Sequence, residues 1–358
     1  MSAGGDAGAR VERVTVEPLD LPLREPFEIS LGTQHEAHNV LVSVETDDGT
    51  VGYGEGSPLP PVTGETREAA LATARAAGEL LDGEPVADYR RLAGDLRDAF
   101  PGAVSALFAV ETALLDAHCR ERGLALSELF GGAPRPVTTD LTIPILPSED
   151  AADRAHDAVS EGFEHLKVKT GSGVEADVER VTAVREAAPD AELKVDANQG
   201  WTPAETIRFA RELRDRGVDL ALIEQPVDAA DIEGLRHVRE RIAIPVAADE
   251  AVFTPEDAMR VVRAGAADVV NVKLGKSGPV AAAEIAAIAR AANCQLMVGC
   301  MLESAIGIHT SAHVVAGLGG FDYVDLDGNL LLAEDVVPTE RSPTVDIAGP
   351  GHGVVPDR

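Results

Sequence analysis

Five charged residues end successive apolar runs in the middle of the chain: Lys169, Asp196, Glu224, Asp249 and Lys273. Neighbours in this series are about 24 to 28 residues apart, which is room for one strand and one helix. Because the carboxyl ends of parallel strands meet at one edge of a sheet or barrel, we expect the five side chains to lie close together. Three carboxylates between two ammonium groups predict a metal-assisted site for proton transfer.

The three carboxylates are candidate metal ligands. Asp196, Glu224 and Asp249 supply the hard oxygen atoms that an octahedral Mg²⁺ prefers, with positions left for water and a substrate carboxylate. A single carboxylate at a strand end is better explained as a helix cap or a salt-bridge partner, so the prediction depends on the set. Asn198 and Glu250 lie close to these ligands in the sequence. They are predicted to hold the ligands in position without binding the metal themselves.

Lysine is scarce in this sequence, so each lysine that is present is a candidate for a functional role. Only five of the 31 basic residues are lysines. Lys167 and Lys169 point to the same side of a strand, and two ammonium groups that close are expected to lower the pKa of one toward that of a usable base. Lys194 is predicted to pair with a ligand carboxylate. Lys276 is out of phase with Lys273 and is predicted to be a loop charge.

The composition restricts the class of protein and its partners. A chain of 358 residues with 45% hydrophobic residues favours two domains with ample cores. The formal net charge of −30 disfavours nucleic acid and anionic membranes as partners. No apolar run reaches the roughly 18 residues of a membrane span, the start has no apolar leader, and three cysteines make no disulfide framework. These features predict a cytoplasmic protein.

From residue 138 onward, short apolar runs alternate with stretches of helical period. The predicted strands are 138–145, 163–169, 191–196, 219–224, 243–249, 268–273, 294–299 and 322–327. An open doubly wound sheet would gather its chemistry at one switch point, whereas here charged residues end most of the strands. The pattern therefore predicts an α/β protein with a TIM-like barrel.

The sequence pattern is different before and after the predicted barrel. Residues 1–132 predict an α+β capping domain that begins with antiparallel strands, with helices over 65–82 and 103–122. Within it, residues 22–36 and 53–64 are predicted to be long loops that serve as lids. The barrel is assigned to residues 133–329. Residues 330–358 are predicted to return and pack on the capping domain.

The motifs KVK (167–169), KVDANQGW (194–201), IEQP (223–226), ADE (248–250) and NVKLGKSG (271–278) resemble those of the enolase superfamily, muconate-lactonizing subgroup. The resemblance covers nearly the whole chain and implies a (β/α)7β barrel with one Mg²⁺ per site on Asp196, Glu224 and Asp249. It also implies Lys169 and Lys273 as bases on opposite faces of the substrate and an enediolate intermediate, as in enolase-type sites generally. A proton can then leave one face and return on the other, which is the geometry of a racemase or epimerase.

The last strand selects among the activities of the subgroup. Asp325 and Asp327 lie on one side of it, and we interpret them as a clamp for an ammonium group, although Asp-Leu-Asp-Gly also suits a turn. An Asp-x-Asp sequence here resembles the dipeptide epimerases, which implies inversion of the C-terminal residue of an L,L-dipeptide. The alternatives within the family are an N-succinylamino acid racemase, an o-succinylbenzoate synthase and a muconate-type cycloisomerase. A Schiff-base aldolase and a binding protein are the alternatives outside it.

The remaining expected substrate contacts are Lys167, Thr142, Cys300 and Gly32. Gly32 stands in the first capping loop, where relatives that prefer glutamate carry an arginine. We therefore expect a neutral or apolar C-terminal side chain in the substrate. His35 and His38 in the same loop are interpreted as surface residues, and a homo-oligomer is a further expectation.

Overall fold

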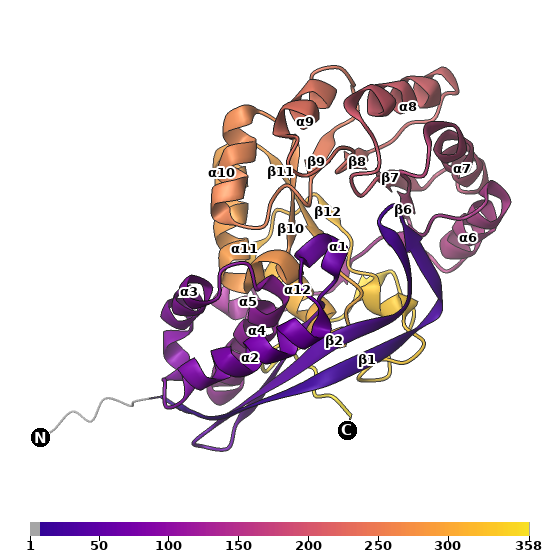
Figure 1. Cartoon of the computed structure of the whole chain (residues 1–358). Coiled ribbons are helices and arrows are strands. Elements are labelled where there is room, and N and C mark those ends of the chain that lie inside the picture. Colours follow the sequence, from indigo (N-terminus) through magenta and orange to yellow (C-terminus); the bar gives the residue numbers. More distant parts are fainter. Residues whose placement is uncertain (1–7, 358) are drawn as a thin grey trace, which may run out of the picture.

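The computed structural model describes residues 8–357, so the first seven residues of the predicted capping domain and Arg358 of the predicted tail lie outside the described residues. The described chain forms a parallel barrel and a smaller domain that covers one end of it, referred to below as the cap (Figure 1). None of the helices in residues 8–357 combines the length and the apolar character that crossing a membrane requires.

Eight parallel strands form the barrel in sequence order. They are β5 (Leu141–Ile143), β6 (His165–Lys169), β7 (Glu192–Asp196), β8 (Leu222–Glu224), β9 (Val246–Ala248), β10 (Val269–Lys273), β11 (Gln295–Gly299) and β12 (Tyr323–Val324). The backbone N of Asp140 donates to the carbonyl oxygen of Val324 at 3.2 Å, which joins the first strand region to the last. The predicted α/β barrel is confirmed.

One helix connects each pair of consecutive barrel strands. These are α6 (Ser148–Ser160), α7 (Val174–Ala187), α8 (Pro203–Asp215), α9 (Ile232–Arg239), α10 (Pro255–Ala264), α11 (Leu274–Ala291) and α12 (Ala305–Leu318). Thr202 and Thr254 cap α8 and α10, since their side chains accept hydrogen bonds from Glu205 N and Asp257 N. Apolar strand residues pack outward against these helices, which leaves the strand ends free to carry charge.

The cap contains one antiparallel sheet and several helices. Its strands are β1 (Val11–Ile29), β2 (Gly32–Thr46) and β3 (Val51–Gly56), and its helical segments are α1 (Pro60–Thr63), α2 (Arg67–Leu81), η1 (Val86–Asp88), α3 (Tyr89–Ala99), α4 (Val104–Arg122) and α5 (Leu126–Leu129). Strand β3 lies so close to α4 that a Cβ atom on Gly54 would be 2.0 Å from the Ala109 carbonyl oxygen, so glycine is required there. The helices predicted at 65–82 and 103–122 are confirmed as α2 and α4.

The prediction of a long loop over residues 22–36 is wrong. Strands β1 and β2 continue through this region as a hairpin, with Phe27 opposite Gln34 and Ile29 opposite Gly32. Apolar and polar residues alternate along Phe27, Glu28 and Ile29, which is a strand pattern that the polar neighbours obscured. The hairpin reaches from the cap to the barrel (Figure 1), where Ser30 Oγ donates to the Asn198 carbonyl oxygen at 2.7 Å.

The C-terminal segment returns to the cap. Strand β13 (Thr344–Val345) pairs with β4 (Val137–Thr138), and η2 (Gly328–Leu331) precedes it. Farther on, the backbone N of Leu126 donates to the Gly351 carbonyl oxygen at 2.8 Å, and Arg120 Nη2 donates to the Val354 carbonyl oxygen at 2.7 Å. The final residues of the chain therefore complete the packing around α4.

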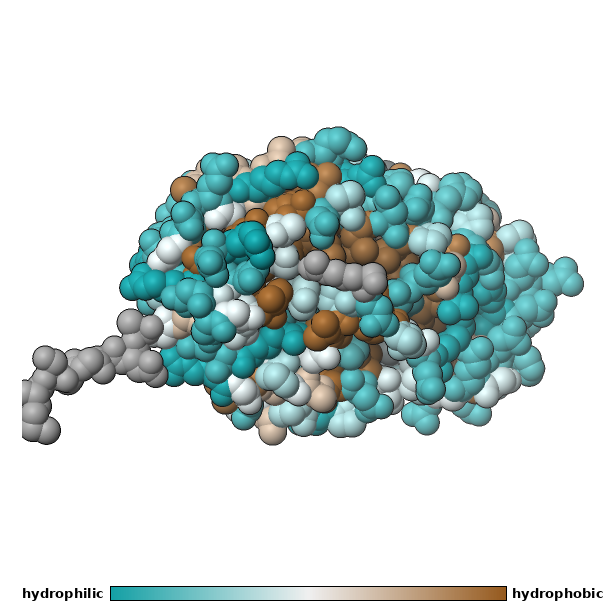
Figure 2. All heavy atoms as spheres, turned by 90° about the horizontal axis from the view of Figure 1, so that it is seen from below, coloured by the Kyte–Doolittle hydropathy of each residue, from teal (hydrophilic) through white to brown (hydrophobic). Residues whose placement is uncertain are grey.

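The face seen from below is largely hydrophilic, with apolar side chains gathered in its middle (Figure 2). Large apolar side chains that are exposed in the described residues are few, namely Leu80, Val159 and Val355. No observation in the described residues tests the predicted homo-oligomer, which stays a prediction.

Candidate active site

The strand register brings the predicted carboxylates and lysines together. Lys169, Asp196 and Glu224 are paired side by side at the ends of β6, β7 and β8. Asp249 follows β9, and Lys273 ends β10. All five residues are buried, and both lysines line one pocket at this end of the barrel. The residues lining it are Phe27, Ile29, Gln34, Leu59, Val62, Thr142, Lys167, Lys169, Asn198, Glu250, Lys273, Cys300, Met301, Leu302, Asp325, Asp327, Gly328 and Leu331.

Each predicted base is bonded to a different predicted metal ligand. Lys169 Nζ donates to Asp196 Oδ2 at 2.6 Å, and Lys273 Nζ donates to Asp249 Oδ2 at 2.8 Å. Burial disfavours the charged form of Lys273, yet the neighbouring Asp249 and Glu224 carboxylates outweigh it and hold the pKa of Lys273 above its ordinary range. The two ammonium groups come from β6 and β10, which are separated by three strands in the barrel.

Glu224 lies between these two pairs and keeps one oxygen free. Its Oε1 accepts a hydrogen bond from Asn271 Nδ2 at 2.5 Å, while its buried Oε2 has no hydrogen-bond partner within residues 8–357. Burial, reinforced by the nearby Asp196 carboxylate, raises the pKa of Glu224 to about 8. A buried carboxylate oxygen without a hydrogen bond carries a desolvation cost, which the Lys167 ammonium group at 3.6 Å offsets in part and a bound cation would offset further.

Two lysines depart from their predicted roles. Lys276 is not a loop charge, because it is buried in the first turn of α11 and its Nζ donates to Asp249 Oδ1 at 2.5 Å. Together with Lys273 it overcomes the effect of burial and lowers the pKa of Asp249. Lys194 is paired at 2.5 Å with Asp140, not with a predicted metal ligand. The alternation of side chains along a strand does not predict the position of Lys276, because the helix starts at residue 274 and directs this side chain toward the site.

The prediction that like charges lower the pKa of one of the two neighbouring lysines is not met at Lys167. Its Nζ contacts Asp325 Oδ2 and lies 3.6 Å from Glu224 Oε2. Burial opposes the charged form, but the surrounding carboxylates, Asp325 foremost, raise the pKa of Lys167 well above its ordinary value. Attraction to several buried carboxylates exceeds repulsion by one neighbouring ammonium group.

Asp325 and Asp327 both line the pocket, as the clamp interpretation requires. Asp327 Oδ2 accepts a hydrogen bond from the backbone N of Thr142 at 2.5 Å. Lys167 overcomes the effect of burial and lowers the pKa of Asp325 to about 2, whereas burial and Asp325 raise the pKa of Asp327 to about 6. One carboxylate is thus already bound to an ammonium group, and the other is held by a backbone amide.

With Asp140, these two aspartates form one of two groups of potential ligand atoms that lie within 4.8 Å of one another in residues 8–357. Asp140 is paired with Lys194, and Asp325 with Lys167, so ammonium groups are already paired with two of its three carboxylates.

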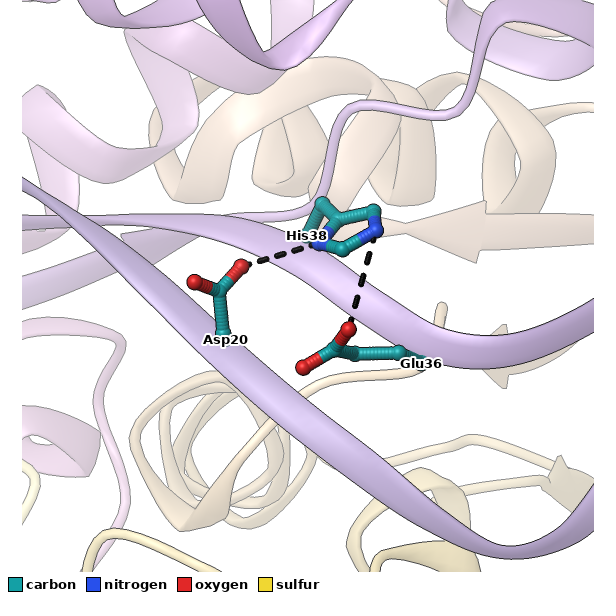
Figure 3. Close-up of side chains that lie close together, drawn as sticks. All are labelled: Asp20, Glu36 and His38. Carbon is teal, nitrogen blue, oxygen red and sulfur yellow. Dashed lines mark hydrogen bonds and ion pairs between the residues drawn. The ribbon is translucent and has the colours of Figure 1, made fainter.

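The second group is His38 with Asp20 and Glu36 on the β1–β2 hairpin (Figure 3). His38 Nδ1 is 2.9 Å from Asp20 and its Nε2 is 3.8 Å from Glu36. The His38 side chain is 54% exposed, and Arg67 also contacts Asp20. These are surface ion pairs, in agreement with the interpretation of His38 as a surface residue.

The apolar part of the pocket wall comes from the cap and from the loops that follow the last two barrel strands. Phe27 and Ile29 belong to the hairpin, and Leu59 and Val62 lie at α1. Thr142 and Cys300 line the pocket as expected, but Gly32 is not among the lining residues of the described chain. The hairpin instead presents Gln34, because Gly32 lies at the turn with φ of 138°.

Sequence reasoning missed one buried polar residue at the site. Asn271, which binds Glu224, precedes Lys273 by two residues, so strand alternation would have found it. Glu303 is fully buried below the loop after β11, where its Oε1 accepts from the Met301 backbone N at 3.2 Å. Burial, with Glu55 nearby, raises the pKa of Glu303 to about 8. The two predicted supporting residues do contact each other, since Asn198 Nδ2 donates to Glu250 Oε1 at 3.1 Å.

The capped barrel carries buried acids and lysines at the carboxyl ends of its strands, which is where barrel enzymes place their active sites. Residues 150–358 match the family Enolase C-terminal domain-like, and residues 11–131 match the Mandelate racemase / muconate lactonizing enzyme, N-terminal domain. The chain belongs to the enolase superfamily, as its motifs predict, and it is an isomerase.

Relatives of known activity cover nearly the whole chain. The L-Ala-D/L-Glu epimerase of Thermotoga maritima is 39% identical over 328 residues, or 92% of this chain and 95% of the relative. The aromatic dipeptide epimerase of Herpetosiphon aurantiacus is 38% identical over 325 residues, or 90% of this chain and 91% of the relative. The dipeptide epimerase of Enterococcus faecalis V583, solved with Mg and the dipeptide L-Leu-L-Tyr, matches with a TM-score of 0.91 at 35% identity and covers 96% of this chain and 99% of its own.

Proposed function

We propose that the protein is a Mg²⁺-dependent dipeptide epimerase that inverts the C-terminal residue of an L,L-dipeptide by two-base 1,1-proton transfer. The observation that carries this proposal is the lining of one pocket by Lys169, Lys273, Asp325 and Asp327. Two lysines from separate strands can serve the two faces of one carbon atom, and two aspartates can hold a free amino terminus. The relatives named as dipeptide epimerases support the same activity.

The metal-binding residues in this proposal are Asp196, Glu224 and Asp249. All three are buried carboxylates at neighbouring strand ends, and Glu224 Oε2 accepts no hydrogen bond in the described residues. Lys169 is bonded to one oxygen of Asp196, and Lys273 and Lys276 are bonded to the two oxygens of Asp249. These bonds are compatible with ligation, because each carboxylate oxygen has more than one lone pair. A Mg²⁺ ion held there would supply positive charge beside the substrate carboxylate and so make the α-proton more acidic.

The lysines of the chain carry out the proton transfer. In the L to D direction, the neutral form of one lysine, either Lys169 or Lys273, accepts the α-proton, and the protonated form of the other donates a proton to the opposite face. Their hydrogen bonds to Asp196 and Asp249 hold the two nitrogen atoms in place. In the same proposal, Lys167 contributes positive charge near the substrate carboxylate, and Thr142 and Cys300 contact the dipeptide.

The wall contributed by the cap indicates the substrate side chain. Phe27, Ile29, Leu59 and Val62 are apolar, and the pocket lining within the described residues contains no arginine. An acidic side chain would lose its hydration there without gaining a partner. We therefore propose a dipeptide whose C-terminal residue is apolar.

A deuterium-exchange screen tests the proposed function. The protein with Mg²⁺ is incubated in D₂O with a library of L,L-dipeptides and with N-succinylamino acids, and the α-proton signal is followed by NMR. We expect exchange and inversion at the C-terminal residue of dipeptides with apolar side chains. Exchange of N-succinylamino acids alone would favour the racemase alternative, and exchange of no compound in either set would refute both.

A further inference from the structure

A buried carboxylate links the cap to the barrel next to the pocket. Glu55 of β3 is fully buried, and its Oε2 accepts a hydrogen bond from Ser304 Oγ at 2.5 Å. Its oxygens also accept from the backbone N of Ser304 at 2.9 Å and from Gly307 N at 3.3 Å. A side chain of the cap thus binds the first turn of α12 in the barrel, where backbone N–H groups lack partners within the helix.

Asn39 of β2 extends this link to the wall of the pocket. Its Nδ2 donates to Glu55 Oε1 at 2.7 Å and to the Leu302 carbonyl oxygen at 2.8 Å. Asn39 is 2% exposed, so water does not replace these bonds. Leu302 lines the substrate pocket together with Cys300 and Met301. One buried amide therefore holds both the carboxylate of the cap and the backbone of the pocket wall.

The loop held in this way lies directly on the turn that follows Lys273. A Cβ atom on Gly275 would be 3.3 Å from Met301 Cγ and 3.0 Å from Glu303 Oε1. On its other side, a Cβ on Gly328 would be 2.3 Å from the Met301 carbonyl oxygen. Contacts this close leave the loop few alternative positions, so its anchor determines the space beside one of the two predicted bases.

We propose that Asn39 and Glu55 are positioning residues that fix the loop of residues 300–304 as a wall of the substrate pocket and thereby set the discrimination between substrate side chains. This inference rests on the proposed dipeptide epimerase function. Neither side chain lines the pocket in the described chain, so their effect passes through Leu302 and Ser304. The cap then contributes to selectivity twice, directly through its hairpin and indirectly through this link.

Two substitutions test the link, and a third provides a matched control. Glu55→Gln places an amide N–H group against the N–H donors of α12, and Asn39→Ala leaves the Leu302 carbonyl oxygen without its partner. Glu65→Gln is the control, because Glu65 is also a buried glutamate at a helix start. It accepts from the Ser105 backbone N at 2.7 Å, near the beginning of α4, within the cap.

We expect KM for an apolar dipeptide to rise about tenfold in Glu55→Gln and Asn39→Ala, with a smaller change in kcat, which corresponds to one lost buried hydrogen bond. The ratio of kcat/KM between dipeptides with apolar and acidic C-terminal residues should fall by a similar factor. Glu65→Gln should keep both values even where its Tm falls. If the two test variants match Glu65→Gln in KM and in this ratio, the proposed positioning role is wrong.

Hydrogen exchange of the full chain with Mg²⁺ tests the same link without substrate. Amides of residues 300–307 should exchange faster in Glu55→Gln and in the milder Ser304→Ala, whereas Glu65→Gln should affect amides near Ser105. Unchanged exchange of the loop in both variants would overturn the inference whatever the substrate is. A wild-type protein that exchanges no dipeptide α-proton would instead overturn the proposed function and leave this test of the link standing.

Discussion

The barrel side and the cap side of the pocket carry different kinds of side chain. The barrel side carries charged groups at strand ends, where Lys169 and Lys273 are each bonded to a carboxylate. The cap side presents apolar groups such as Phe27 and Leu59 from a hairpin and a short helix. Charged groups suit proton transfer, and apolar walls suit the choice of a side chain. We therefore expect the charged strand ends to govern the reaction and the apolar wall, of which the cap supplies part, to govern the choice of side chain.

The two sides also differ in how firmly they are held. Lys169, Asp196 and Glu224 are fixed by the register of a continuous parallel sheet. The tip of the hairpin is held to the barrel by single contacts, such as the bond from Ile145 N to the Glu28 carbonyl oxygen at 3.0 Å. A substitution on the cap side should thus alter selectivity while it leaves the charged groups in place.

The largest effect is expected for the two bases. Lys169→Ala and Lys273→Ala should each reduce epimerisation by about 10³-fold or more, because each removes a group that accepts or donates the proton. NMR in D₂O should still detect α-proton exchange of one epimer in each variant, and the epimer should differ between the two. Full activity in either variant would exclude the two-base reaction.

Metal removal should have a comparable effect that is reversible. EDTA should abolish activity and added Mg²⁺ should restore it, because three buried carboxylates at the strand ends lose their shared cation. The assay is dipeptide inversion followed by polarimetry. Activity that persists in EDTA, together with a borohydride-trapped adduct on a lysine, would point to the Schiff-base alternative.

The ammonium clamp should give an intermediate effect. Asp325→Asn and Asp327→Asn should each raise KM for a dipeptide by about ten- to a hundredfold, the range for one hydrogen bond to a charged group. The same dipeptide with an acetylated amino terminus serves as the control and should show little difference between variant and wild type. Equal losses for both substrates would contradict the clamp.

On the cap side, Ile29→Arg should change selectivity more than rate. The new guanidinium group faces the pocket and should raise kcat/KM for an acidic C-terminal residue relative to an apolar one by about tenfold. Leu80→Arg is the control, because Leu80 is 51% exposed on α2 and does not line the pocket. An equal loss of kcat/KM for all dipeptides would contradict the proposal that the cap side affects selectivity more than rate.

The smallest effect concerns the pH dependence of stability. Burial, with Glu55 nearby and Lys273 opposing, raises the pKa of Glu303 from 4.5 to about 8. The folded state therefore binds a proton that the unfolded state releases between these values, so this contribution to stability is complete below pH 4.5 and is lost as the pH rises through about 8. The Tm of Glu303→Gln relative to the wild type should increase from pH 5 to pH 8, and a constant difference would contradict the raised pKa.

The barrel could be predicted because its signals are local and repeated. Apolar runs at a regular interval identify the strands, and the caps at Thr202 and Thr254 identify helix starts. The positions of Lys169 and Asp196 followed from the same period. Their roles in the reaction stay predictions.

The errors arose where distant segments meet. Lys276 was misplaced because its partner Asp249 comes from another strand end, and no spacing within its own helix reports that contact. The hairpin over residues 22–36 was read as a loop because its stability depends on pairing and on contact with the barrel. The link through Asn39 and Glu55 likewise joins residues that are far apart in the chain.

The return of the C-terminal segment to α4 affects the order in which the protein is completed during synthesis. The cap leaves the ribosome first, but Gly351 and Val354, which bind Leu126 and Arg120, leave it after all eight barrel strands. Until those residues emerge, the cap lacks these two bonds and part of its packing. The cap can thus reach its final state only after the whole barrel has been translated.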